Sequence, residues 1–330
     1  MPIKLRMATF NLENLDDKPG QKPMLSERIA LMRPQLLRLN ADILCLQEVN
    51  GQEEPGQPRR LLALETLLAG TSYATYQKVS TITEDGAQVY DERNLVILSR
   101  FEITEHHQYK HDFAPAPRYR KVTAKPEENE AKEVTWERPI LHAKIKLDNN
   151  RVLDLINIHL KSKLPTNIEG QKVDNYTWKT PSGWAEGFFL SSMKRVGQAL
   201  ETRMLIDKLF DANEDGLIVV CGDFNADLDE VPVEAIRGDV ENTGNDKLAK
   251  RVIVPCERTI PEPSRFSLLH HGQGRMIDHL LVSRPLLAHY RGSEIHNELL
   301  HDESVAFGTD VKFPESDHAP VIAEFELPEG

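Results

Sequence analysis

The sequence predicts an α/β protein in which sheets and helices pack in layers, in preference to an all-β protein. Short apolar runs of strand length recur along the 330 residues, and several of them end in a polar cluster. One segment, 191–210, has its apolar residues at helical spacing and leads directly into the apolar run 217–221. The sequence has no internal repeat and no linker rich in Gly, Ser or Pro, so we expect a single domain, 1–330.

The first elements are a strand and an interrupted helix. Residues 3–7 alternate apolar and polar side chains, which is typical of a strand, and this pattern ends in the string FNLEN at 10–14. Ser26 can cap the helix that follows, but Pro34 falls in its middle and removes a backbone hydrogen bond. We therefore expect two helical pieces or one bent helix.

The later elements also show either the spacing of apolar residues typical of a strand or that typical of a helix. Residues 42–49 form an almost continuous apolar run, which suits a strand buried on both faces, and Glu48 within it would be costly to bury without a partner. A short helix is predicted at 61–68. Further strands are predicted at 94–99, 140–147, 152–158, 217–221, 276–283 and 320–327.

Two stretches break these patterns and are predicted to be loop insertions, 118–137 and 161–190. The first is highly charged and lacks apolar periodicity. The second holds Trp178 and Trp184, which together with Tyr176 could stack on exposed bases, although aromatic residues of a long loop more often pack against that loop.

The composition excludes some classes of function. With 52 acidic and 40 basic residues the formal charge is −12, so any contact with phosphate must be local. Cys45, Cys221 and Cys256 show no metal-ligand spacing, which fits a reducing compartment. No apolar run has the length of a membrane span or a signal peptide, so we expect a monomeric cytoplasmic protein, or a secreted one if a signal was removed.

The turn after the apolar run 217–221 carries the first candidate catalytic groups. Its sequence, GDFN, presents Asp223 and Asn225 on one side of the turn, where they can share a phosphate or an attacking water. His159 ends another apolar run, and an isolated histidine in that position is usually a hydrogen-bonded core residue. The other candidates in the chain favour a catalytic role for it.

A second candidate group pairs residues from distant parts of the chain. Asp278 lies within an apolar run, where a carboxylate without a partner would be expensive. His318, near the C-terminus, is its natural partner. His279 points to the opposite face of the same strand, and we predict that it is structural.

Eight short strings occur in a fixed order along nearly the whole chain. They are FNLEN (10–14), LQEV (46–49), YDERN (90–94), ERP (137–139), INIHL (156–160), CGDFNAD (221–227), IDHLLVS (277–283) and SDHAP (316–320). Each string is common by chance, but their ordered combination is specific, and it resembles the endonuclease/exonuclease/phosphatase superfamily with the deoxyribonuclease I fold. The resemblance implies a four-layer α/β sandwich of two packed mixed β-sheets flanked by helices.

The resemblance also implies a divalent-metal site. Glu48 would be the principal ligand of Mg²⁺ or Mn²⁺, with Asn11 and Asp317 nearby and Glu13 at the rim. A phosphodiester is a diffuse anion that resists nucleophilic attack, and a hard cation held by oxygen ligands neutralises its charge.

Proton transfer would fall to two imidazoles, each oriented by a carboxylate. The resemblance implies that Asp278 orients His318 and that Glu92 orients His159. Which imidazole is the base and which the acid stays open. The residues that would contact the phosphate or the attacking water are Asp223, Asn225, Arg138, Tyr90 and Lys161.

The sequence therefore predicts a metal-dependent phosphodiester hydrolase, most closely a nuclease that cleaves DNA or RNA. The string HLKSK at 159–163 is similar to one in bacterial nucleases of this superfamily. A phosphatase or phospholipase-type esterase with the same site is the alternative, although the tryptophan-cysteine-aspartate-arginine motif of inositol-polyphosphate 5-phosphatases is absent, since His279 follows Asp278. A catalytically silent phosphate-binding protein should have lost ligands that are all present here.

Overall fold

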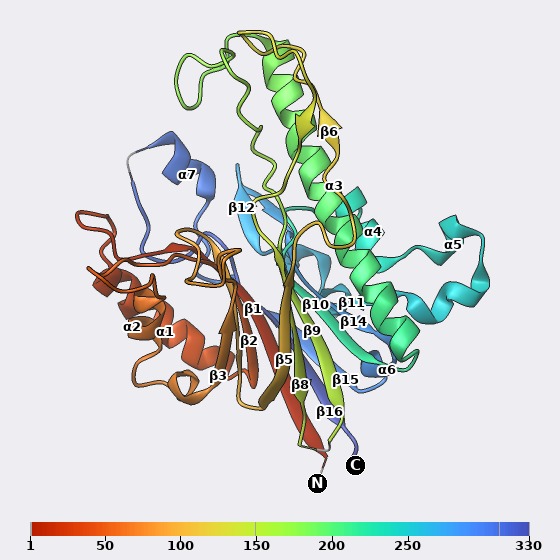
Figure 1. The fold of residues 1–330 in the computed structure, drawn as a ribbon. Helices are drawn as coiled ribbons and strands as arrows, with labels where there is room; N and C mark the ends of the chain where they lie inside the picture. The colour runs from red at the N-terminus through yellow and green to blue at the C-terminus, as the bar shows by residue number, and fades with distance from the viewer. Residues whose placement is uncertain (1, 149, 310, 330) are drawn as a thin grey trace.

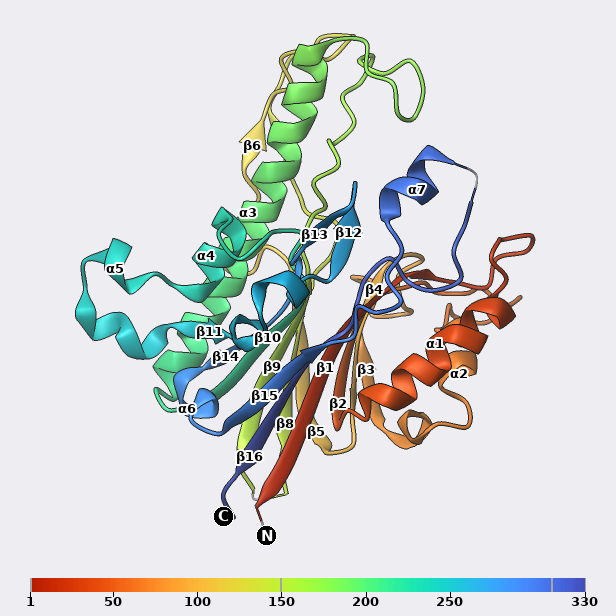
Figure 2. The ribbon, with the colours of Figure 1, turned by 180° about the vertical axis from the view of Figure 1, so that it is seen from behind.

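The computed structural model describes residues 2–148, 150–309 and 311–329, and it contains two six-stranded β-sheets packed face to face (Figures 1 and 2). The first sheet has the order β15 (Tyr290–Ile295), β16 (Val321–Leu327), β1 (Ile3–Leu15), β2 (Ile43–Val49), β4 (Asn94–Ser99), β3 (Gln77–Ser80). The second has the order β11 (Ile253–Pro255), β14 (Asp278–Ser283), β10 (Leu217–Asp223), β9 (Val152–His159), β8 (Ile140–Lys146), β5 (Glu102–Tyr109).

Both sheets are mixed. The pairs β1–β2 and β9–β10 are parallel, whereas β1–β16 and β10–β14 are antiparallel. Two small ribbons add to them, β6 (Arg118–Tyr119) with β7 (Lys132–Glu133) and β12 (Leu268–His270) with β13 (Gln273–Arg275). Because the parallel pair of each sheet ends at the same edge of the sandwich, the polar strings after these strands are brought together.

Helices cover the outer faces of the two sheets, so the predicted four-layer α/β sandwich is confirmed. The helices are α1 (Leu25–Leu39), α2 (Leu62–Leu68), α3 (Pro181–Ala212), α4 (Val231–Arg237), α5 (Val240–Thr243), α6 (Arg284–Leu287) and α7 (Glu303–Gly308). The 3₁₀ turns are η1 (Ser72–Thr75), η2 (Asp246–Arg251), η3 (Cys256–Thr259) and η4 (Glu262–Ser264). Helices α1 and α2 share a core with the first sheet, and α3 and α4 share one with the second.

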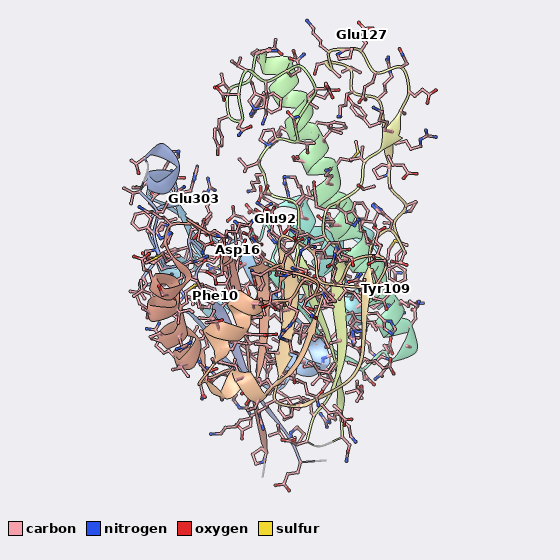
Figure 3. All side chains as sticks on the ribbon, turned by 60° about the vertical axis from the view of Figure 1, so that its left-hand side comes forward. Phe10, Asp16, Glu92, Tyr109, Glu127 and Glu303 are labelled. Carbon is pink, nitrogen blue, oxygen red and sulfur yellow. The ribbon has the colours of Figure 1, made fainter. Side chains whose placement is uncertain are left out.

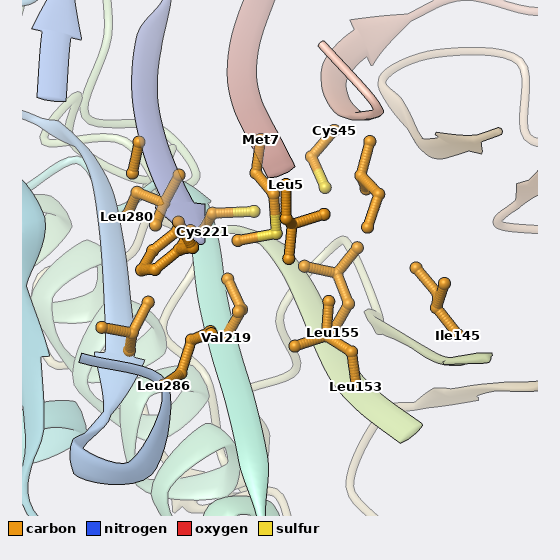
Figure 4. Close-up of a cluster of buried hydrophobic side chains, with 14 of the residues drawn as sticks. Leu5, Met7, Cys45, Ile145, Leu153, Leu155, Val219, Cys221, Leu280 and Leu286 are labelled. Carbon is orange, nitrogen blue, oxygen red and sulfur yellow. The ribbon is translucent and has the colours of Figure 1, made fainter. Parts of the chain in front are cut away.

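The largest core lies between the two sheets (Figure 4). Leu5 and Met7 of β1 face Leu155 of β9 and Val219 of β10 across this layer, while Phe10 on the other side of β1 packs toward α1. Each such large side chain contributes about 1.5–3 kcal/mol on burial. Apolar contacts on both faces of the central strands fix the register in which these strands pair. This register in turn places the polar residues at the strand ends.

Helix α1 is one continuous helix, so of the two expected alternatives, two helical pieces or one bent helix, the first is wrong. It contains Pro34 and begins at Leu25, one residue before the predicted cap, where the Glu27 carboxylate accepts a hydrogen bond from the Met24 backbone. The buried face of the helix, which includes Leu36, packs on the first sheet and outweighs the single hydrogen bond that proline removes.

The second predicted insertion is only partly a loop. Helix α3 begins at Pro181, with the Thr180 side chain accepting a hydrogen bond from the Gly183 backbone, so residues 181–190 are helical. The first turns of α3, together with 118–137 and 161–180, project beyond the sheets as a lobe that we call the arm (Figures 1 and 2).

A small apolar cluster and a buried carboxylate hold the arm together. Trp178 packs in this cluster, beside Ile168 and Leu190. The Glu186 carboxylate accepts hydrogen bonds from the backbone of Val122 and from the Tyr119 hydroxyl. The described part of the chain contains no helix that combines the length and the hydropathy needed to cross a membrane.

Candidate active site

The polar strings meet at one end of the sandwich, at the base of the arm. His159 at the end of β9 pairs in register with Asp223 at the end of β10, and Asp223 pairs with Asp278 at the start of β14. Figure 3 shows the labelled Asp16 and Glu92 at this end of the sheets. The predicted convergence of residues that are far apart in the sequence is therefore present.

The backbone at this end adopts conformations that cost energy. Glu48 and Asn225 have φ values of 57° and 49°, in the left-handed region, and Glu13 and Asn14 have φ values of 45° and 49°. Gly222 has φ 135°, and a Cβ atom there would lie 1.9 Å from the Ile158 carbonyl oxygen. Such outliers cluster where a site requires particular side-chain directions.

His159 lies between two carboxylates. Its Nε2 is 3.2 Å from Asp223 Oδ2 and 3.5 Å from Glu48 Oε1, and the residue is only 2 % exposed. Burial lowers the pKa of His159, Arg138 lowers it further, and Asp223 and Glu48 oppose this. We infer a neutral imidazole whose Nε2–H donates to these carboxylates.

Asp223 is the acceptor shared by its neighbours. Its Oδ2 accepts hydrogen bonds of 3.1 Å from Asn11 Nδ2 and from Asn225 Nδ2, and its Oδ1 accepts one of 2.8 Å from the Asn225 backbone. Burial alone would raise the pKa of Asp223, but His159, His318 and the hydrogen bond from the Asn225 backbone hold it below its usual value. Asp223 is therefore an anion at neutral pH.

The predicted contact between His318 and Asp278 is present. His318 Nδ1 lies 2.7 Å from Asp278 Oδ2, and Asp278 is fully buried. Burial would lower the pKa of His318, but the charge and hydrogen bond of Asp278 raise it well above its usual value. The second ring nitrogen, Nε2, lies 3.8 Å from Asp317 Oδ1.

The end of β1 and the segment before β16 carry the remaining acidic groups. Glu13 Oε2 accepts a hydrogen bond of 3.1 Å from the Asp317 backbone, and Glu48 Oε2 accepts one of 3.0 Å from the Asn14 backbone. Burial raises the pKa of Asp317 well above its usual value, which His318 opposes while Glu13 and Glu48 add to it. Asp317 Oδ1 is buried and has no hydrogen-bond partner among the described residues.

Those observations fit a hard divalent cation. Anionic oxygens that crowd one another and leave a buried lone pair unused gain from a cation that takes oxygen ligands. Two compact groups of possible ligands occur among the described residues, Glu48–His159–Asp223 and Asp223–Asp278–His318, each with its ligand atoms within 4.8 Å of one another. Asp317 belongs to neither group, so an ion shared by Glu48 and Asp317 stays a prediction.

The structure corrects the expected role of Glu92. Its side chain is 56 % exposed and lies 3.5 Å from Lys18 Nζ, whereas the carboxylates next to His159 are Glu48 and Asp223. Glu92 follows β3 in an exposed loop, and no strand holds it at the convergent edge. The carboxylates that orient His159 come instead from the strand ends themselves.

The three residues expected to contact phosphate lie in different surroundings. Arg138 is buried and donates through Nη1 to the carbonyl oxygens of His159 and Leu160, while its Nε has no partner in the described residues. Lys161 Nζ donates to Ser162 Oγ, and burial lowers the pKa of Lys161 to about 8. Tyr90 is half-buried, and its backbone N–H donates to Asn94 Oδ1.

Two arginines that the sequence did not single out contact this region. Arg93 Nε donates to Asn14 Oδ1 at 3.1 Å, and the backbone of the same Asn14 donates to Glu48. Arg28, on the buried face of α1, donates to backbone carbonyls at the end of β1. The position of Arg93 inside the string YDERN was a signal that could have found it, whereas an arginine on an amphipathic helix gives none.

His279 has the structural role predicted for it. Its Nδ1 lies 2.7 Å from Glu257 Oε1 and its Nε2 lies 2.8 Å from the Ala226 carbonyl oxygen, with both His279 and Glu257 fully buried. Burial lowers the pKa of His279, but the hydrogen bond and charge of Glu257 outweigh this and leave the pKa raised.

This buried pair gives a testable stability prediction. Since the folded-state pKa of His279 is raised, its contribution to stability is fully present below the unfolded value of about 6.5 and is lost as the pH rises through the folded-state pKa. Glu257→Gln should lower the free energy of unfolding by about 3–5 kcal/mol at pH 6 and by less at pH 9, measured by urea denaturation. An equal loss at both pH values would contradict a charged His279.

Comparisons with known proteins agree with this geometry. The family model described as "Endonuclease/Exonuclease/phosphatase family" matches residues 8–318. No curated protein matches the chain.

Solved structures give the same fold over nearly the full length. A truncated Caenorhabditis elegans TDP2 is 16 % identical, with a TM-score of 0.57 and 98 % of both chains covered. An endonuclease/exonuclease/phosphatase family protein from Bacteroides thetaiotaomicron is 15 % identical, with a TM-score of 0.59 and coverage of 99 % of this chain and 96 % of the other. The 3′ phosphatase NExo from Neisseria, bound to product DNA hairpin, is 17 % identical, with a TM-score of 0.51 and coverage of 97 % and 99 %. The chain belongs to the endonuclease/exonuclease/phosphatase family, and this membership supports a hydrolase that acts on phosphoesters.

Proposed function

We propose that the protein is a Mg²⁺- or Mn²⁺-dependent phosphodiester hydrolase, and specifically a nuclease. The observation that carries the proposal is the meeting of two imidazoles of opposite pKa shift, the buried His159 and the half-buried His318, around the carboxylate of Asp223. A neutral imidazole beside a protonated one is the arrangement that general acid–base catalysis at neutral pH needs. The three free, buried cysteines fit the cytoplasmic location predicted for a monomeric enzyme.

Glu48, Asn11 and Asp317 would hold the divalent ion. Glu48 is the anchor, because His159 and Arg93 keep its pKa below the usual value although burial alone would raise it. When bound, the ion would neutralise charge on the phosphate and on the oxygens that change charge during hydrolysis. His159 is not expected to be a Mg²⁺ ligand, since imidazole suits softer metals.

Residues of the protein would have separate roles in the hydrolysis. Asp223, as an anionic acceptor, and Asn225, held by Asp223 and by the Leu160 carbonyl oxygen, would orient the attacking water and one phosphate oxygen. His159, whose Nε2 faces the carboxylates of Asp223 and Glu48, would donate its Nε2–H to them and keep Asp223 in place. His318, whose Nδ1–H is fixed by Asp278, presents a proton on Nε2. Arg138, with its unpartnered Nε, would contact the phosphate.

The arm favours a polynucleotide over a small phosphoester. Its segment 161–180 rises from the site and exposes Tyr176, which is 75 % exposed, and α3 exposes Trp184, which stacks on Phe188 with ring centroids 5.6 Å apart. Stacking of a base on such a ring contributes about 1–3 kcal/mol. Basic residues of this segment outnumber acidic ones in an otherwise acidic protein: Lys161, Lys163, Lys172 and Lys179 against Glu169 and Asp174.

A substrate panel tests the proposal. Plasmid DNA, single-stranded DNA, RNA, bis-p-nitrophenyl phosphate, p-nitrophenyl phosphate and inositol or lipid phosphates are incubated with enzyme and Mg²⁺ or Mn²⁺, and with EDTA as the control. We expect metal-dependent cleavage of the nucleic acids and of the diester. Hydrolysis of monoesters or lipid phosphates alone would instead establish the phosphatase or phospholipase-type alternative.

A further inference from the structure

Arg28 is a buried arginine whose guanidinium donates hydrogen bonds to backbone carbonyls of other segments instead of facing the solvent. It lies on the inner face of α1 and is 6 % exposed. Its Nη2 donates to the Leu12 carbonyl oxygen at 2.7 Å, its Nη1 to the Glu13 carbonyl oxygen at 3.0 Å, and its Nε to the Pro314 carbonyl oxygen at 3.3 Å. One guanidinium thus joins two segments that are about 300 residues apart in the sequence.

These two segments carry two of the three expected metal ligands, Asn11 and Asp317. Leu12 follows Asn11 directly, and Pro314 comes three residues before Asp317. Two further contacts join the same segments: Ser316 Oγ donates to the Asn11 carbonyl oxygen at 2.8 Å, and the Asp317 backbone donates to Glu13 Oε2 at 3.1 Å. Arg28 therefore lies behind the ligand-bearing backbone and not among the ligand side chains.

The charge of Arg28 is held close to these carboxylates, and among the described residues its guanidinium forms no ion pair. Each hydrogen bond that its guanidinium makes within the described residues goes to a carbonyl oxygen. Burial lowers the pKa of Arg28, while the nearby charges of Glu13, Asp317 and Glu48 raise it. The buried guanidinium of Arg28 reduces the electrostatic repulsion among these carboxylates before a metal ion binds. It also leaves their oxygens free to coordinate that metal ion.

We propose that Arg28 is a positioning residue of the metal site, which sets the affinity for the divalent ion by fixing the backbone that carries Asn11, Glu13 and Asp317. This inference rests on the proposed metal-dependent function. Lysine keeps the positive charge but cannot donate in three directions from a planar group, so Arg28→Lys separates the geometric effect from the charge.

Helix α1 supplies a matched control. Arg33 is on the same helix, and its guanidinium also donates to backbone carbonyls, those of Leu67 at 3.0 Å and Thr66 at 2.6 Å in α2. Arg33→Lys therefore removes a similar helix-to-backbone link at a place remote from the expected ligands. If Arg28 were only a structural link, the two lysine variants should behave alike.

The test is direct binding of Mn²⁺ by the full chain, followed through the electron paramagnetic resonance signal of the free ion, together with the Tm in EDTA. We expect Arg28→Lys to weaken Mn²⁺ binding by about 10–100-fold, as outer-shell changes at metal sites do, and Arg33→Lys to leave it within about twofold of wild type. Arg28→Gln, measured in the same way, serves if the lysine variant does not fold.

The possible results distinguish the proposed role of Arg28 from the proposed metal-dependent function. Equal Mn²⁺ affinity in wild type and in a folded Arg28 variant would overturn the role of Arg28 and leave the metal-dependent function standing. Equal weakening in the Arg28 and Arg33 variants would also overturn it, because the effect would then be general destabilisation. Absence of Mn²⁺ binding by the wild-type protein would overturn the metal-dependent function itself.

Discussion

Glu48→Gln is expected to lower kcat/KM for bis-p-nitrophenyl phosphate in Mg²⁺ by about 10³-fold or more. The amide keeps the size of the side chain and can still accept the hydrogen bond from the Asn14 backbone, but it removes the charge that would hold the ion. Since a bound cation contributes several kcal/mol of charge stabilisation in the transition state, its loss corresponds to several powers of ten in rate. Steady-state kinetics over a range of Mg²⁺ concentrations measures the effect.

Glu92→Gln is the matched control for this variant. The resemblance implied that Glu92 works at His159, whereas the structure places it at the surface beside Lys18, so its amide variant should keep near-normal turnover. Thermal unfolding in EDTA should show that both variants fold. Near-normal activity of Glu48→Gln would remove Glu48 from the metal site, and a large loss in Glu92→Gln would contradict the observed surroundings of His159.

The second large effect concerns His318 and Asp278. Each alanine variant is expected to lower kcat by about 10²–10⁴-fold, the range typical of a general acid or base. The double variant should be little worse than His318→Ala alone, because Asp278 acts through the imidazole that it orients at 2.7 Å.

A double-mutant cycle on kcat, with the free energy of unfolding measured for each variant, checks this expectation. His159→Ala provides the comparison, because His159 contacts Asp223 and Glu48 and its loss should not erase the effect of Asp278→Ala. Additive losses for His318 and Asp278 would show that the two residues act separately, in spite of their contact.

Much of the fold was predictable because the strands in the centre of the sandwich are buried on both faces. Their apolar runs are hard to mistake, and polar residues that end such runs, such as Glu48 and Asp223, would carry a large cost unless they had partners. Periodicity likewise predicted the part of α3 that packs on the second sheet, although it missed the first turns, where the helix lies in the arm.

Two of the errors, at Pro34 and Glu92, share a physical cause, which is that tertiary structure and not local sequence decides the outcome. Pro34 is accommodated because its helix packs on the first sheet, and nothing near it in the sequence reports that packing. The start of α3 had a local signal in Thr180 and Pro181, which the prediction of a loop insertion at 161–190 did not use. Glu92 was assigned through a motif, while its place was decided by the exposed loop that carries it.

By itself, the sequence determined the central strands of both sheets but not their edge strands, β3, β5, β11 and β15. It also determined that the polar ends of the central strands hold the chemistry and that Asp278 needs His318, because the cost of burying a charge depends mainly on local burial. Only the tertiary structure decided that His159 lies between Glu48 and Asp223, and that Arg28 ties the end of β1 to the segment before Asp317. Those contacts depend on how two sheets and a helix pack at one edge, and short-range patterns carry no information about distances across the sandwich.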